Sequence, residues 1–163
     1  MPAPDNISVS PQRHRPVHQP LVEQHNRSII VFLTVCTKGR QPLLANRRTH
    51  QALGEAWTQA DHWLVGRYVI MPDHLHLFCA PGRLPVKPLI NWVRYWKASV
   101  SKSVGAGEGS FWQADFWDTQ LRRHESYAAK WDYVRNNPVR AGLAAGPDDW
   151  PYQGEQNLLR WHQ

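Results

Sequence analysis

The distribution of apolar residues along the chain predicts four strands. A β-branched apolar run from 28 to 37 is typical of a buried strand. Two further apolar runs lie within residues 64 to 81, and the Pro-Asp turn at 72–73 between them predicts a hairpin. The segment from 111 to 122 predicts a fourth strand, whose boundaries the pattern leaves open.

Three segments with helical periodicity alternate with these strands. Residues 46 to 63 place apolar side chains three and four positions apart, and Asn46 is a candidate N-cap. The second helix is expected over 85 to 102. The third is expected over 125 to 137, where Pro138 should stop it.

The resulting order is strand, helix, strand, strand, helix, strand and an additional helix. It predicts an α+β fold of the ferredoxin-like, split βαβ type, with an antiparallel sheet and helices on one face. Residues 1–26 are rich in Pro, Gln and His without periodicity and are expected to form a flexible basic arm. We therefore expect one domain over 27–145, followed by a tail over 146–163 with little pattern.

Composition supports a folded protein with a polyanionic partner. The 163 residues are enough for a core, and 42% are hydrophobic. Lys and Arg total 19 against 13 Asp and Glu, and the net charge of +6 favours nucleic acid as the partner.

Hydropathy and cysteine spacing bear on the cellular location and on the redox state of the thiols. No apolar run reaches the length of a membrane span, and prolines interrupt the N-terminal region where a signal peptide would be apolar. We therefore expect a cytoplasmic protein with no membrane contact. Cys36 and Cys79 belong to no CxxC pair and are expected to be reduced and buried.

Two histidines in the hairpin are the main candidates for chemistry. In "MPDHLHLF", His74 and His76 share one face of a strand, whereas Leu75 and Leu77 point to the other face, toward the core. Two imidazoles so close together can bind one divalent metal ion. Ordinary polar residues on a solvated sheet face would show the same pattern, so both interpretations stay open.

The third helix carries a second polar pair. Tyr133 lies off the apolar stripe of this helix, and Asn137 follows one turn later. A phenol and an amide placed in this way could face one metal-bound group. A rim tyrosine and a C-cap asparagine are the simpler alternatives. The stripe, which should pack on the sheet, consists of Tyr127, Ala128, Trp131 and Val134.

Basic residues interleaved with aromatic ones provide candidate contacts to DNA. Such a mixture suits single-stranded DNA, because cations pair with phosphates and bases stack on rings. Most of the tryptophans are nevertheless expected to be core residues, and Lys130 could be a solvated surface lysine. The candidates are Arg94, Lys97, Arg122, Arg123 and Lys130.

Four segments resemble the REP-associated tyrosine transposases, relatives of the single-tyrosine HUH transposases. They are "YVIMPDHLHLF", "NWVRYWKASV", "FWQADFWDTQLR" and "WDYVRNNPVRAGL". The resemblance implies His74 and His76 as metal ligands, Tyr133 as the nucleophile and Asn137 as the third, amide-bearing ligand. Transposon relatives often have Gln in that last place, whereas Asn fits the REP-associated branch. Tyr127 is the rival tyrosine, but the residue four positions later is a tryptophan, which cannot bind a metal.

The resemblance also implies an activity. A single-stranded DNA endonuclease and strand transferase that depends on Mg²⁺ or Mn²⁺ would act on hairpin DNA, forming a 5′-phosphotyrosine at Tyr133. It could work as a monomer or a homodimer. A hairpin-DNA binding protein that no longer cuts is the alternative. A metallohydrolase without a nucleic-acid partner would lack further ligands and leave the basic charge unexplained.

Overall fold

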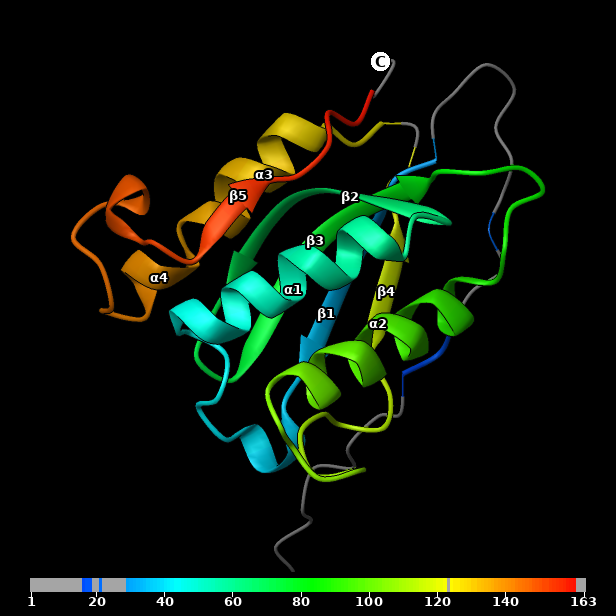
Figure 1. The fold of residues 1–163 in the computed structure, drawn as a ribbon. Coiled ribbons are helices and arrows are strands. Elements are labelled where there is room, and N and C mark those ends of the chain that lie inside the picture. The colour runs from blue at the N-terminus through cyan, green and yellow to red at the C-terminus, as the bar shows by residue number, and fades with distance from the viewer. Residues whose placement is uncertain (1–15, 19–20, 22–28, 123, 161–163) are drawn as a thin grey trace, which may run out of the picture.

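A five-stranded antiparallel sheet forms the centre of the computed structural model, which describes residues 16–18, 21, 29–122 and 124–160. The spatial order of the strands is β4-β1-β3-β2-β5 (Figure 1). The first four strands and the two intervening helices follow the ferredoxin-like order, so the predicted fold class is confirmed. The strands are β1 (Val31–Cys36), β2 (Trp63–Ile70), β3 (His74–Pro81), β4 (Trp117–Gln120) and β5 (Gln153–Glu155).

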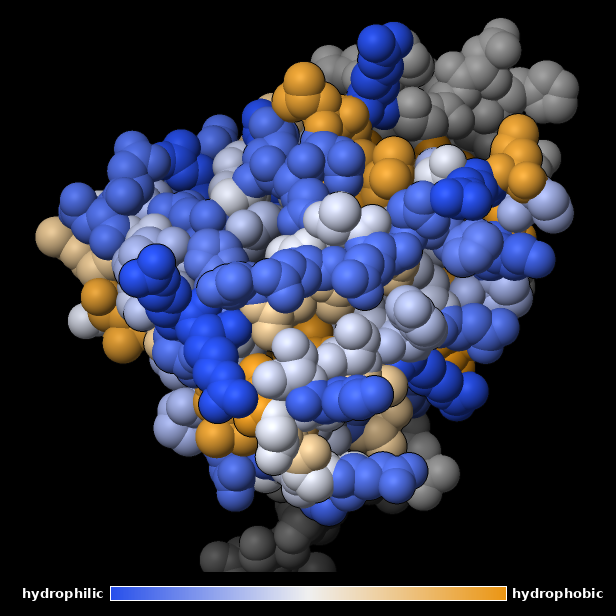
Figure 2. All heavy atoms as spheres, viewed as in Figure 1, coloured by the Kyte–Doolittle hydropathy of each residue, from blue (hydrophilic) through white to orange (hydrophobic). Residues whose placement is uncertain are grey.

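Helices α1 (Arg47–Gln59) and α2 (Leu89–Ser103) cover one face of this sheet (Figure 1). Asn46 caps α1, because its side chain accepts the backbone N–H of Thr49 at 2.9 Å, and the predicted N-cap is confirmed. The outer surface of this helical layer is mostly hydrophilic (Figure 2), as expected for helices that bury only their inner sides.

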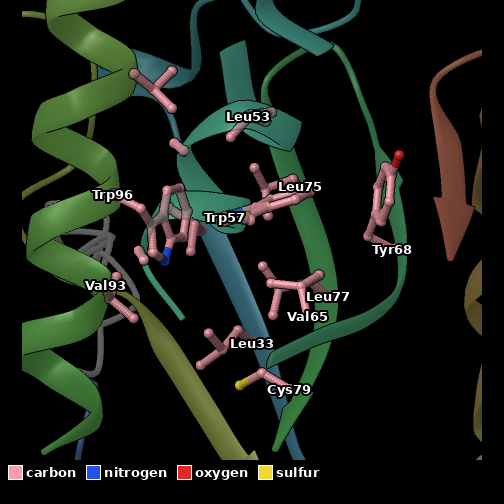
Figure 3. Close-up of a cluster of buried hydrophobic side chains, with 14 of the residues drawn as sticks. Leu33, Leu53, Trp57, Val65, Tyr68, Leu75, Leu77, Cys79, Val93 and Trp96 are labelled. Atoms are coloured by element: carbon pink, nitrogen blue, oxygen red, sulfur yellow. The ribbon is translucent and has the colours of Figure 1, made fainter. Parts of the chain in front are cut away.

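The main core lies between the two helices and the sheet (Figure 3). Leu75, Leu77 and Cys79 of β3 belong to it, which confirms the side of the strand predicted to face the core. Trp57 of α1 and Trp96 of α2 meet edge to face there, with ring centroids 5.9 Å apart. Because the helices occupy this face, the alternate residues of β3 point to the opposite face.

A second apolar cluster lies under α3 (Tyr127–Arg135), on that opposite face. The Tyr127 ring packs against Phe78 with centroids 4.8 Å apart, and Trp131 contacts the same ring at 6.4 Å. Val134 is buried as well, so the predicted apolar stripe is confirmed for these three helix residues. Ala128 is exposed, and the prediction was wrong for that residue.

The chain beyond α3 contains elements that the sequence pattern did not predict. Pro138 stands in the first turn of a short helix, α4 (Asn137–Arg140), because a proline there gives up no helical hydrogen bond. A 3₁₀ turn, η2 (Pro147–Asp149), then leads to β5, which pairs with the edge of β2. The tail therefore adds a fifth strand to the predicted four.

The structure also bears on the remaining sequence-based expectations. The predicted N-terminal arm lies outside the described residues except for 16–18 and 21, where His18 pairs with Asp115 and Asp118. Both cysteines are buried and unpaired, as expected. Within the described part of the chain, no helix is both long and apolar enough to cross a membrane.

Candidate active site

His74 and His76 lie together on the sheet face opposite the main core. Their ring centroids are 4.9 Å apart and the rings are nearly perpendicular, at 79°. Both side chains are partly exposed. Because side chains alternate between the two faces along β3, the two imidazoles lie side by side at the surface.

Each imidazole is held through its Nδ1 atom. Nδ1 of His74 lies 2.7 Å from Oδ1 of Asp73, and Nδ1 of His76 lies 2.8 Å from Oγ1 of Thr34, its register partner on β1. When Nδ1 carries the proton in these bonds, Nε2 has a free lone pair. No hydrogen bond involves either Nε2 atom among the described residues. This arrangement is typical of histidines that bind a metal through Nε2.

Burial favours a neutral His76, and hydrogen bonds favour an ionised Asp73. Burial lowers the pKa of His76 to about 3, and the charges of His74, Arg40 and Arg140 add to that effect. Burial opposes ionisation of Asp73, but hydrogen bonds from His74 and Arg40 outweigh it and hold the pKa of that carboxyl below its usual value. Arg40, at the end of the 3₁₀ turn η1 (Lys38–Arg40), donates Nε–H to Asp73 at 2.9 Å. A neutral imidazole is the form that binds metals.

Tyr133 and Asn137 lie where α3 gives way to α4. Tyr133 is 68% exposed, and Asn137 is the first residue of α4. Arg140 connects them, because its guanidinium carbon lies 4.1 Å from the centroid of the Tyr133 ring and its Nη2 donates to Oδ1 of Asn137. The same arginine helps to lower the pKa of His76.

The sequence pattern did not predict four residues of this arrangement. Asp73 could have been noticed as a carboxylate next to His74 in the predicted turn. Arg140 stands three residues after Asn137, a helical spacing that could have suggested their contact. Thr34 and Arg40 could not have been found in this way, because only the strand register and the path of η1 bring them to the histidines.

Tyr127, the rival tyrosine, has a structural role. It is 7% exposed, and its hydroxyl oxygen accepts the backbone N–H of Arg67 at 3.1 Å. Burial raises the pKa of its phenol. This placement argues against Tyr127 as a nucleophile.

Lys130, one of the predicted DNA contacts, lies over the face of the sheet that carries the histidines. Nζ of Lys130 stands 5.1 Å from the centroid of the Phe32 ring, and that ring stacks on His76 at 5.2 Å. Arg122 is exposed just beyond β4. Arg123 lies outside the described residues.

The other two predicted contacts belong to α2, on the opposite face of the sheet. Arg94 is exposed there, away from the histidine pair. Lys97 is only 7% exposed and donates Nζ–H to the carbonyl oxygen of Gln113 at 2.7 Å, and burial lowers the pKa of its ammonium group. The predicted phosphate contact of Lys97 needs correction, because its ammonium is used inside the protein.

Known proteins resemble this chain in sequence, although no family model matches it. A REP-associated tyrosine transposase from Escherichia coli (strain K12) is 26% identical over 88 residues, which cover 54% of this chain and 52% of that protein. A Haemophilus influenzae relative assigned to the same family is 29% identical over 97 residues, covering 51% of this chain and 53% of the relative. The chain thus spans about half the length of these curated relatives.

A solved structure resembles the chain over a longer stretch. The structure of a REP-associated tyrosine transposase bound to a REP hairpin covers 83% of this chain and 82% of its own, with a TM-score of 0.65 and 22% identity. At this identity the likeness shows a shared fold. The resemblance to the REP-associated tyrosine transposases that the motifs indicated is therefore confirmed by curated relatives of that name, and the fold by a solved structure.

Proposed function

We propose that the protein is a metal-dependent single-stranded DNA endonuclease and strand transferase that acts on hairpin DNA through Tyr133. The observation that carries this proposal is that Arg140 contacts both an exposed tyrosine and an asparagine amide in the α3–α4 segment. Helix α3 packs on the same sheet face as the two imidazoles, which are held by their Nδ1 atoms. The name of the curated relatives, and the hairpin bound in the solved structure, support hairpin DNA as the substrate class.

The residues of the site fit a divalent metal ion. The two imidazoles and the amide oxygen of Asn137 would hold it, with Thr34 and Asp73 fixing the orientation of the rings. Mn²⁺ tolerates such nitrogen ligands better than Mg²⁺, which prefers oxygen. When bound, the ion would neutralise the negative charge that develops on the phosphate.

Tyr133 would carry the covalent step. Its hydroxyl oxygen would attack the phosphorus and lose its proton, while the bond from phosphorus to the 3′ oxygen breaks and the leaving 3′ oxygen takes up a proton. The products are a 5′-phosphotyrosine and a free 3′-hydroxyl. The new ester conserves the energy of the phosphodiester, so a second 3′-hydroxyl can reseal the strand without ATP. Lys130 and Arg122 are candidates for contacts to the phosphates of this strand.

The test is the formation of a covalent adduct. Hairpin oligonucleotides from repeats that flank the coding sequence would be incubated with the protein and Mn²⁺ or Mg²⁺, then analysed in SDS. We expect an adduct that is lost with EDTA and in Tyr133→Phe but retained in Tyr127→Phe. Light scattering of the protein with its DNA would distinguish a monomer from a homodimer.

The alternative function makes a different prediction for the same experiment. A hairpin-DNA binding protein that does not cut would bind the oligonucleotides tightly and form no adduct with either metal. That result would overturn the proposed cleavage and retain the proposed DNA partner.

A further inference from the structure

An exposed tryptophan stands at the edge of the sheet. Trp117 is the first residue of β4, the outermost strand of the described sheet on that side, and it is 45% exposed. An indole ring gains free energy by leaving water, so an exposed one is available to stack on a ligand. Six other tryptophans are buried: Trp57, Trp63, Trp92, Trp96, Trp112 and Trp150.

The strand register places Trp117 in one row with the candidate site. Trp117 pairs with Thr34 of β1, and Thr34 pairs with His76 of β3. Directly paired residues of an antiparallel sheet project from the same face, and the 2.8 Å bond between Thr34 and His76 agrees with this. Neighbouring strands are about 4.8 Å apart, so β4 and β3 are separated by roughly 10 Å.

Cations lie near this row. Lys130 stands over Phe32, which stacks on His76. Arg122 is exposed beyond the end of β4. An exposed ring next to cations is the combination with which proteins bind single-stranded DNA, since the bases stack and the phosphates pair with charge.

We propose that Trp117 is a stacking platform for one nucleobase of the single strand, close to the phosphate that is cut. The inference rests on the proposed function, because it takes the histidine pair as the place of the scissile phosphate. Trp117 on β4 and the histidine pair on β3 are about two strand spacings apart, which suits a base that flanks that phosphate. Every base has a π face, so the platform would contribute affinity for the single-stranded flank with little preference for its sequence.

The test measures binding apart from cleavage. Labelled hairpin oligonucleotides with a single-stranded extension would be titrated by fluorescence anisotropy in a Tyr133→Phe background, so that the DNA stays intact. Trp117→Ala should raise the Kd about 5- to 150-fold, and Trp117→Phe, which keeps a ring, should raise it less. Tyr95→Ala is the control, because it removes a ring that is 60% exposed on α2, on the other side of the sheet.

A scan of the extension would identify the base. Each nucleotide in turn would be replaced by an abasic sugar, and at one position Trp117→Ala should cause no further loss of affinity. An unchanged Kd in Trp117→Ala, or an equal further loss at every abasic position, would overturn the platform.

The two proposals fail in different ways. If the protein with Tyr133 intact forms no adduct while Trp117→Ala weakens binding at one position, the platform stands and the cleavage proposal fails. If an adduct forms and the Kd is unchanged in Trp117→Ala, the cleavage proposal stands and the platform fails. A protein that binds none of these oligonucleotides would refute both.

Discussion

The guanidinium of Arg140 lies over the ring of Tyr133, 4.1 Å from its centroid. A phenol that is 68% exposed would otherwise rotate freely at the end of α3, and a cation over its ring restricts that motion. The same guanidinium donates a hydrogen bond to Asn137, so one side chain fixes both residues of the proposed site that come from the α3–α4 segment. We therefore expect Arg140 to act as a positioning residue for Tyr133.

Replacing Arg140 should slow the covalent step more than it weakens binding. We expect Arg140→Ala to reduce the single-turnover rate of adduct formation on the order of 100-fold, because a nucleophile displaced by about 1 Å loses about that much. Arg140→Lys should restore part of the rate, since it keeps the charge. The hairpin Kd, measured in parallel, should change far less.

Arg135→Ala is the matched control for this experiment. Arg135 ends α3, and its guanidinium pairs with Asp148 at 2.7 Å. Its loss should leave the adduct rate close to that of the unmodified protein. Equal rates in Arg140→Ala and Arg135→Ala would refute the positioning role.

Replacing the two tyrosines of α3 should have different effects, because Tyr127 supports the stability of the fold and Tyr133 is the proposed nucleophile. Tyr127→Phe removes the oxygen that accepts the Arg67 N–H at the irregularity of β2, and the unsatisfied N–H should lower the free energy of unfolding by about 1–3 kcal/mol. Tyr133→Phe, at an exposed position, should change it by about 0.5 kcal/mol or less. Urea denaturation of both variants provides the measurement. An adduct that is lost in Tyr127→Phe at a temperature where the variant is folded would contradict this division.

Strands β1 and β3 and helices α1 and α2 could be predicted because their apolar, buried residues recur with the period of a strand or a helix. β5 could not, since the three residues of Gln153–Glu155 have no apolar alternation, and the strand forms by backbone pairing with β2. Pro138 was expected to end a helix, yet proline suits the first turn of a new one equally well. Local sequence does not distinguish these two outcomes.

The candidate site was predictable only where its residues share one element. His74 and His76 follow from strand alternation alone. The contact of Thr34 with His76 depends on the register between two strands 42 residues apart in sequence. The burial of Lys97 depends on the loop that carries Gln113, which no helical wheel of α2 could show.

Thr34 should contribute to metal affinity through His76. Thr34→Val removes the hydroxyl that bonds Nδ1 while keeping the shape of the side chain, so the ring should lose its fixed orientation. Loss of such an outer partner typically costs about 10- to 100-fold in metal affinity. Calorimetric titration with Mn²⁺ measures the change directly. Thr119→Val is the control, because Thr119 is an exposed threonine on β4, opposite Phe32. A loss of equal size in both variants would refute the specific role of Thr34.

His50 should make the stability of the protein depend on pH. Its Nε2 lies 2.8 Å from the hydroxyl oxygen of Tyr68, and burial between α1 and the sheet lowers the pKa of the imidazole from 6.5. The folded state therefore disfavours the protonated ring. The contribution of the neutral ring is complete above a pH of about 6.5, the pKa in the unfolded chain, and is lost as the pH falls toward the lower pKa of the folded state.

His50→Gln isolates this contribution, because glutamine does not titrate and can still bond the Tyr68 hydroxyl. Urea denaturation of both proteins over a range of pH gives the difference in their free energies of unfolding, in which the other histidines cancel. Relative to the variant, the unmodified protein should lose stability as the pH falls below about 6.5. A difference that is constant with pH, or that grows in favour of the unmodified protein in acid, would mean that burial does not disfavour the His50 imidazolium.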